Sequence, residues 1–321
     1  MSKAVNESTE KIKLVLIYLT FGTVGLVAHF IPLSSSVIVF YRALLGGIFI
    51  IFMSLLQGKT IDVKSIKDNF VVLIFTGFFM GLNWVLQFEA FRVSSVAIGT
   101  VCYNTMPIFL VIIASFIFNE KIDIKTSICI IIATIGVVLV SNVINTGIKS
   151  DEVLGCVYGV LGAIFYALIL IFNRKLSNIA MHDKIIFQFS FSAVVMLLYA
   201  SFIEKSSFVF DKNLSQDEII IGVICILLLS CLHTGFCYVQ YFTAVANLKA
   251  KTVAILTYID PVVAMLLSFF VLKESMTKLQ FLGAVLILSS TLINEMIKID
   301  SDLNEDNTIK NKILKIFKKK L

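Results

Sequence analysis

The chain has 321 residues and a net charge of +6, with 58% hydrophobic and only 15% charged residues. A soluble domain carries about 45–50% apolar and about 25% charged residues, and a mean hydropathy of +0.96 shows the same apolar excess. The composition excludes a soluble enzyme, a nucleic-acid-binding domain, a disordered protein and a disulfide scaffold. The basic residues are scattered over loops and the C-terminal tail, so the charge does not indicate a nucleic-acid partner.

The apolar residues form blocks of about 18–25 residues, the length that an α-helix needs to cross a bilayer. They predict an all-α integral membrane protein with ten transmembrane helices. In chain order these are Leu14–Ile31, Ser36–Leu56, Phe70–Phe91, Ser94–Phe118, Lys125–Val143, Val153–Leu176, Lys184–Ile203, Glu218–Val245, Thr252–Leu272 and Leu279–Met296. A cleaved signal peptide is the alternative for the first block, but that block is long for a signal core.

Most of the 27 lysines and arginines fall in segments on the same side as the N-terminus. Loops rich in Lys and Arg stay in the cytoplasm. We therefore predict a multi-pass protein of the cell membrane with both termini cytoplasmic.

The second half of the chain repeats features of the first at a constant offset. Pro107 and Pro261 are two of only three prolines, and Glu120 and Glu274 each follow one of them by thirteen residues. Five helices per copy is an odd number, so the two copies must cross the membrane in opposite senses, as in many secondary transporters. The predicted units are two inverted five-helix repeats, residues 11–143 and 153–296.

Residues 297–321 form a basic tail in which apolar residues recur at helical spacing. This pattern predicts an amphipathic helix on the anionic cytoplasmic leaflet. A simple orientation signal is the alternative, and the two are compatible.

These repeats resemble the ten-helix drug/metabolite transporter superfamily, specifically its EamA-like members. Besides the Pro and Glu positions, the resemblance rests on Phe40-Tyr41-Arg42, Ala90 and Asp260-Pro261. Asn119 and Lys273 depart from the family, which usually has Gly before the Glu. The resemblance implies a transporter of small metabolites, often an exporter.

A charge at the bilayer centre costs about 2.5–3.5 kcal/mol on insertion scales, so each one needs a reason. Arg42 and Glu89 share the outer leaflet, and we predict an ion pair between them that either fixes helix packing or forms an outer gate. Alternatively, Arg42 binds a carboxylate-bearing substrate. Asp260 lies near the midplane beside Pro261, with His233 at similar depth, and we predict that they bind substrate or couple transport to protons.

Uncharged polar and aromatic residues recur at helical spacing in the third, fourth, eighth and ninth helices. Those predicted to line a central substrate site are Asn83, Trp84, Gln87, Tyr103, Asn104, Gln240 and Tyr258, with helix breaks at Pro107 and Pro261. Polar groups avoid lipid, so these stripes should face one another. A site of this composition suits a small amphipathic solute that is cationic or zwitterionic.

We predict a secondary transporter, and more specifically an exporter, of a small organic metabolite such as an amino acid, working by alternating access. Its partners are the substrate, the lipid bilayer and, in one hypothesis, protons; the oligomeric state stays open. The alternatives are a channel-like facilitator, an uptake carrier for a nucleoside-type or cofactor-like metabolite, and an intramembrane enzyme using His233 and Asp260. The sequence has no Walker motif, Cys/His metal cluster or nucleophile constellation, so we predict no cofactor, metal or catalysis.

Overall fold

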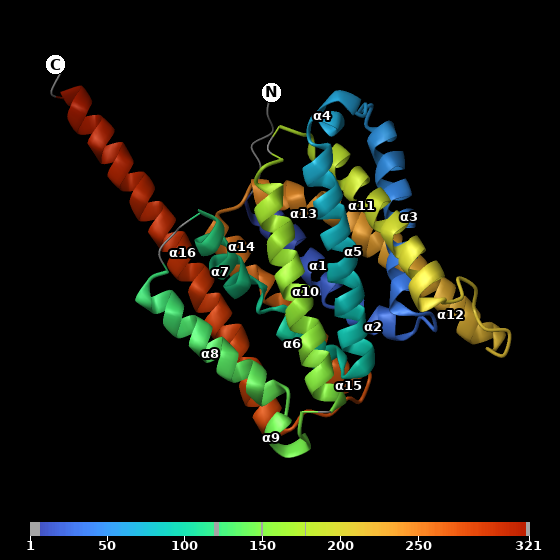
Figure 1. Ribbon diagram of the computed structural model, residues 1–321. Helices are drawn as coiled ribbons and strands as arrows, with labels where there is room; N and C mark the ends of the chain where they lie inside the picture. The colour runs from blue at the N-terminus through green and yellow to red at the C-terminus, as the bar shows by residue number, and fades with distance from the viewer. Residues whose placement is uncertain (1–6, 119–121, 149, 177, 319–321) are drawn as a thin grey trace.

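The computed structural model describes residues 7–118, 122–148, 150–176 and 178–318, and within these residues every regular element is a helix (Figure 1). The first half contains α1 (Glu7–Phe21), α2 (Val24–His29), α3 (Ser35–Leu56), α4 (Val63–Asp68), α5 (Phe70–Val93), α6 (Val96–Tyr103), α7 (Met106–Phe118), α8 (Ile124–Val140) and α9 (Val143–Thr146). The second half contains α10 (Asp151–Asn173), α11 (Met181–Leu198), η1 (Tyr199–Glu204), α12 (Gln216–Leu227), η2 (Leu228–Phe236), α13 (Cys237–Ala246), α14 (Ala250–Thr257), α15 (Ile259–Phe270) and α16 (Lys278–Lys318).

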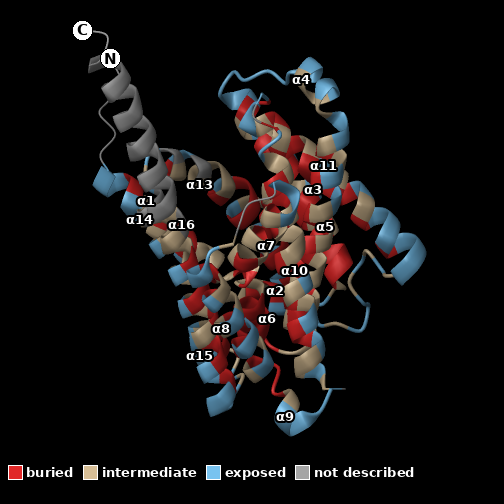
Figure 2. Ribbon diagram, turned by 60° about the vertical axis from the view of Figure 1, so that its left-hand side comes forward, coloured by how far each residue is buried: buried red, intermediate tan, exposed pale blue. Residues whose placement is uncertain are grey.

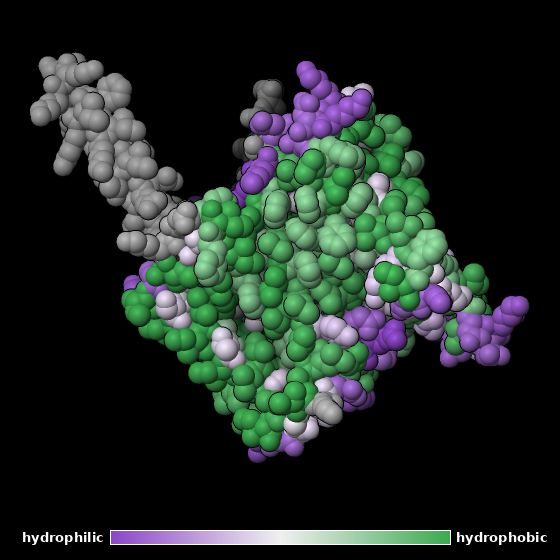
Figure 3. All heavy atoms as spheres, in the orientation of Figure 1, coloured by the Kyte–Doolittle hydropathy of each residue, from purple (hydrophilic) through white to green (hydrophobic). Residues whose placement is uncertain are grey.

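Nine helical stretches of the described chain are long and apolar enough to cross a membrane, and Ile124–Val140 is a shorter apolar helix. The prediction of an all-α membrane protein of about ten helices is therefore confirmed. Figure 3 shows a broad apolar surface between more hydrophilic ends, as expected for a bundle whose sides face lipid. Both ends of the described chain lie at one end of the bundle, opposite α9 (Figure 1).

The first spanning segment is interrupted between α1 and α2, and two further segments are interrupted near their middles, at equivalent points of the two halves. The fourth spanning segment breaks between α6 and α7, and Pro107 lies in the first turn of α7. The ninth breaks at Tyr258, and Pro261 lies in the first turn of α15. Proline has no backbone N–H and suits the first turn of a helix, where that N–H would have no partner. Each proline therefore begins a new half-helix instead of kinking a continuous one.

The eighth spanning segment contains a π-helical stretch, η2, between α12 and α13. Side chains help to bond its widened turns: Nδ1 of His233 lies 2.9 Å from the carbonyl oxygen of Leu228, and the Thr234 hydroxyl donates to the carbonyl of Leu229 at 2.7 Å. Both side chains are buried. Such departures from α-helical winding are frequent at functional sites.

Glycines allow the closest helix contacts in the bundle. A Cβ at Gly159 of α10 would lie 2.8 Å from Cβ of Cys102 in α6, and one at Gly283 of α16 would lie 2.6 Å from the carbonyl oxygen of Gly136 in α8. Small residues bring helices together in this way in membranes, where no hydrophobic effect drives their association. The buried residues gather inside the bundle, with exposed ones along its outer faces (Figure 2).

Helix α16 runs through its membrane span without interruption to Lys318, so that the backbone of the basic tail continues the last spanning helix. Figure 1 shows this segment extending beyond the bundle. The boundary of the tail near residue 297 stays a prediction. Contact of the tail with the membrane surface stays a prediction.

Candidate functional site

Arg42 of α3 is buried in the bundle, with 5% of the residue exposed. Its Nε donates a hydrogen bond to the Thr234 hydroxyl at 2.8 Å, and its guanidinium carbon lies 4.1 Å from the centre of the Trp84 ring and 5.6 Å from that of Phe88. Its Nη1 is buried without a hydrogen-bond partner in the described part of the chain. The charge is held by one hydroxyl and two aromatic faces, an arrangement in which cation–π attraction replaces part of its hydration.

The structure does not bring Arg42 to Glu89, so the predicted ion pair is corrected. Glu89 lies 3.6 Å from Arg92 on its own helix, and both side chains are at least partly exposed. Phe88 faces Arg42, and the next residue of an α-helix points about 100° away. The hypothesis of an outer gate is therefore not supported by an ion pair between Arg42 and Glu89.

His233 contacts the break in the first spanning segment. Its Nε2 lies 2.8 Å from the Thr23 hydroxyl, between α1 and α2, and its Nδ1 faces the Leu228 carbonyl. Both ring nitrogens thus have partners other than Asp260. A direct hydrogen bond or ion pair between His233 and Asp260, as the hypothesis of a coupled pair requires, is absent from the described contacts.

Asp260 lies in the first turn of α15, directly after the helix break, and is half-buried. Its carboxylate interacts electrostatically with the hydroxyls of Tyr18 and Tyr103, and Tyr103 interacts with Arg42 as well. A Cβ at Gly22, in the break of the first segment, would lie 2.9 Å from the carbonyl oxygen of Asp260. The breaks of the first and ninth spanning segments thus lie close together at Asp260.

Tyr103 is fixed by contacts from two neighbouring helices. The Asn83 side chain donates to the Gly162 carbonyl at 2.8 Å and exchanges hydrogen bonds with the Tyr103 hydroxyl at 3.1–3.2 Å. The ring of Tyr103 stacks on Tyr166, with centroids 5.8 Å apart and an interplanar angle of 10°. This places a hydroxyl and an amide where they can orient a solute without adding charge.

We call this group of buried and half-buried residues the central cluster. Its members are Arg42, Asn83, Trp84, Phe88, Tyr103, Tyr166, Phe189, His233, Thr234, Tyr238 and Asp260. Phe189 joins the Trp84 ring, at 5.3 Å, to the Tyr238 ring, at 5.8 Å. Both halves of the chain contribute to the cluster.

Four aromatic residues of the central cluster, Phe88, Tyr166, Phe189 and Tyr238, are not among the site residues predicted from the sequence. Tyr238 does not share the predicted polar face of the eighth helix at α-helical spacing, because the π-helical turns of η2 change the direction of the side chains that follow. Tyr166 continues the face of Gly155, Gly159 and Gly162, whose small-residue spacing predicts close helix packing and gives no sign of a site. Phe189 carries no polar neighbour pattern that could have identified it.

The described contacts do not join the other predicted site residues to the central cluster. The Asn104 amide donates to the carbonyl of Thr100 on its own helix at 2.8 Å, and the Tyr258 hydroxyl is hydrogen-bonded to Thr291 of α16. Gln87 and Gln240 are half-buried, and the described hydrogen bonds do not include them. Their role in substrate binding stays a prediction.

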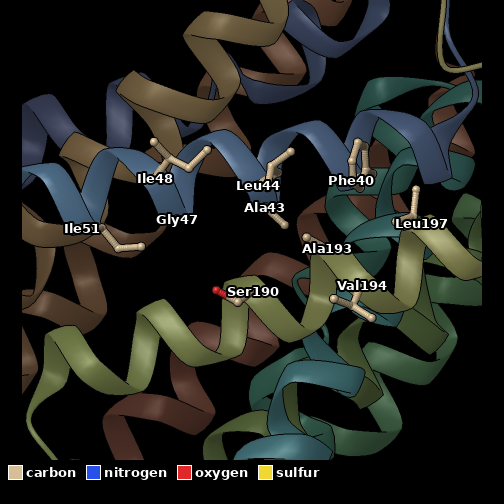
Figure 4. A pocket seen from close by; sticks show the side chains of 10 residues that line it. All are labelled: Phe40, Ala43, Leu44, Gly47, Ile48, Ile51, Ser190, Ala193, Val194 and Leu197. Carbon is tan, nitrogen blue, oxygen red and sulfur yellow. The ribbon is translucent and has the colours of Figure 1, made fainter. Parts of the chain in front are cut away.

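A separate groove of about 380 Å³ lies between α3 and α11. Figure 4 shows it between the side chains of Phe40, Leu44 and Ile48 on one helix and Val194 and Leu197 on the other. Leu44, Ile48 and Val194 are exposed on the outside of the bundle. The groove is lined by apolar groups and one serine, so it lacks the charges of the central cluster.

The helical bundle defines a polytopic membrane protein with polar and charged side chains buried among its helices. The chain belongs to the EamA-like transporter family, which matches residues 11–142 and 153–296. The predicted resemblance to this family is therefore confirmed.

Similar proteins include the uncharacterized transporter YxxF of Bacillus subtilis (strain 168), 28% identical over 88% of this chain and 88% of that protein. A probable amino-acid metabolite efflux pump of Escherichia coli (strain K12) is 26% identical over 58% of this chain and 62% of the pump. An S-adenosylmethionine uptake transporter of Rickettsia prowazekii (strain Madrid E) is 23% identical over 81% of this chain and 82% of the transporter. A protein of known crystal structure, 12% identical, shares the fold with a TM-score of 0.60 over 91% of this chain and 99% of its own.

Proposed function

We propose that the protein is a secondary transporter that exports a small amphipathic metabolite, with the central cluster as its substrate site. The observation that supports this proposal is the placement of two opposite charges inside the bundle, Arg42 from the first half and Asp260 from the second. Intramembrane charges are rare and mark substrate or ion pathways. Sites between two repeats, beside broken helices, are typical of alternating-access carriers.

An amino acid or a related zwitterion is the substrate class that best suits these groups. Arg42 suits a carboxylate, Asp260 suits an ammonium group, and the aromatic faces of Trp84, Phe189 and Tyr238 suit an apolar side chain. Two relatives are named for such solutes, an amino-acid metabolite and S-adenosylmethionine, although in opposite directions of transport. In this proposal the protein lies in the cell membrane with both termini in the cytoplasm, as the distribution of Lys and Arg predicts.

The proposal is tested with purified protein in liposomes preloaded with labelled amino acids. We expect saturable efflux without ATP, recovery of the solute chemically unchanged, and no single-channel current. A changed product would indicate an intramembrane enzyme, and unitary current would indicate a channel. Arg92→Gln is the matched control for substitutions of Arg42, because Arg92 is an exposed arginine whose partner is Glu89.

Coupling to protons is a second hypothesis, supported by the position of Asp260 beside the break of α14 and α15. The carboxylate reaches water alternately from the two sides if the half-helices move, so it can take up and release a proton. Asp260→Asn keeps the shape and removes the titratable group. This variant should still exchange substrate across liposomes but fail to concentrate it under an imposed pH gradient. Accumulation equal to that of the unchanged protein would indicate a facilitator.

A further inference from the structure

We infer that Arg42 is an anion anchor, a subsite that binds the carboxylate of the transported solute against the face of Trp84. The inference rests on the proposed transport function and assigns a chemical group of the substrate to one side chain. The guanidinium, its aromatic support and the hydroxyl that positions it all lie inside the bundle.

The first step is the unused bonding capacity of Arg42. A guanidinium has five N–H donors and no acceptor. Nε is bonded to Thr234 and the guanidinium lies over Trp84, but Nη1 is buried and has no acceptor within the described parts of the chain. A buried polar group without a partner costs free energy, and more so when it is charged. A hydrogen-bond acceptor on the substrate would remove this cost, and this gain favours the binding of an anion at Arg42.

The second step is the absence of a resident counterion. Among the described residues Arg42 forms no ion pair: Glu89 is paired with Arg92, and Asp260, the acid of the central cluster, neighbours Tyr103 as Arg42 does but is not in ion-pair contact with Arg42. The groups that face Arg42 from other elements are the rings of Trp84 and Phe88, the hydroxyls of Thr234, Tyr103 and Tyr238, and His233. A buried cation without a counterion is strongly unfavourable. The arrangement therefore fits a carrier whose substrate supplies the negative charge.

The third step is the identity of the anion. A planar guanidinium matches a carboxylate through two parallel hydrogen bonds. The surfaces beside it, Trp84 and Phe88, are apolar, and His233 already uses both ring nitrogens. A carboxylate carries one charge and so matches the one charge of the Arg42 guanidinium, whereas a phosphate dianion would leave charge unbalanced.

The fourth step is the way in which the fold holds Arg42 in place. A Cβ at Gly46 of α3 would lie 2.9 Å from Cγ2 of Thr234, so α3 and η2 approach closely at this point. The approach allows the Nε bond to Thr234, which fixes the guanidinium and leaves Nη1 without a partner among the described residues. A site preorganised in this way needs little rearrangement when the anion arrives.

Trp84 is the chain's single tryptophan, so its fluorescence reports directly on the guanidinium that lies over it. In lipid nanodiscs the protein is titrated with L-leucine, L-methionine and L-threonine, and with the amides of the same three amino acids. The amides keep the side chain and the ammonium group but lack the carboxylate. We expect the acids to change the fluorescence saturably and the amides to bind about tenfold more weakly or worse. Arg42→Gln should remove the preference for acids, Arg42→Lys should weaken it, and Arg92→Gln should retain it.

The outcomes separate the inference from the proposed function, because the same six compounds are also tested for counterflow in liposomes. Transport with equal binding of acids and amides would overturn the anchor and leave the transporter standing. Transport with an unchanged acid preference in Arg42→Gln would do the same. Neither transport nor binding of any acid would overturn both. The comparison of acids with amides is made in the unchanged protein, so the test holds even if the Arg42 variants fail to fold.

Discussion

At the scale of single residues, the hydroxyl of Thr234 links the buried charge of α3 to the π-helical segment. It accepts from Arg42 Nε at 2.8 Å and donates to the Leu229 carbonyl at 2.7 Å. Thr234→Val keeps the shape but leaves a second guanidinium nitrogen unbonded, which we expect to destabilise the fold by about 1–3 kcal/mol. The measurement is the thermal unfolding midpoint in detergent. Thr234→Ser keeps the hydroxyl and should be close to the unchanged protein; equal loss in both variants would contradict the role of the hydrogen bond.

Sequence alone identified the charged residues of the site but not their partners. Arg42 and Asp260 are recognisable because an ionised group inside an apolar block is costly wherever it points. The partner of Arg42 depends on the rotation of two helices, and the sequence suggested Glu89, whereas the structure places Trp84 and Phe88 there. A difference of one residue along a helix turns a side chain by about 100°, which hydropathy cannot resolve.

At the scale of elements, the positions of the helices follow from the sequence more closely than their internal winding. The apolar blocks and the two prolines predict the spans and the region of each break, because lipid demands long apolar helices and proline begins new ones. The π-helical segment η2 has no comparable signal, since its residues would also suit an α-helix. The π-helical winding of η2 also affects the central cluster, because it determines which side chains of the eighth segment face inward, Tyr238 among them.

The pair formed by α8 and α16 depends on the absence of side chains at two glycines. A Cβ at Gly283 would lie 2.6 Å from the Gly136 carbonyl oxygen, a backbone atom that cannot move aside locally. We expect Gly283→Ala to separate the helices and lower stability by about 1–3 kcal/mol, as overpacking does. Gly47→Ala is the matched control: its Cβ would meet nothing closer than Cβ of Phe189 at 3.6 Å, an ordinary contact. Thermal unfolding compares the two, and equal midpoints would refute close packing of α8 on α16.

At the scale of the whole molecule, the central cluster draws on both halves of the chain. The halves also meet away from it: the Glu274 carboxylate accepts from the backbone N–H of Val96 at 3.0 Å, and Glu204 accepts from the Ser36 hydroxyl. Both acids belong to the second half and bond residues that precede or begin a helix of the first. A carrier that alternates between two states has to break such contacts on one side while it forms others. These two bonds are among the described contacts between the halves that such an exchange would break or keep.

The inverted arrangement of the halves rests on which loops face the cytoplasm, and this can be measured directly. All six cysteines lie in apolar segments, so a cysteine-free background is the starting point. Ile148, between α9 and α10, and Lys64, in α4, are exposed positions for a single new cysteine. With both termini cytoplasmic, Ile148→Cys should react with a membrane-impermeant maleimide added to intact cells, and Lys64→Cys should react only after the cells are opened. The loops lie on opposite sides because an odd number of spans separates them. Labelling of Lys64→Cys in intact cells, with Ile148→Cys protected, would reverse the orientation; labelling of both from one side would exclude the ten-helix topology itself.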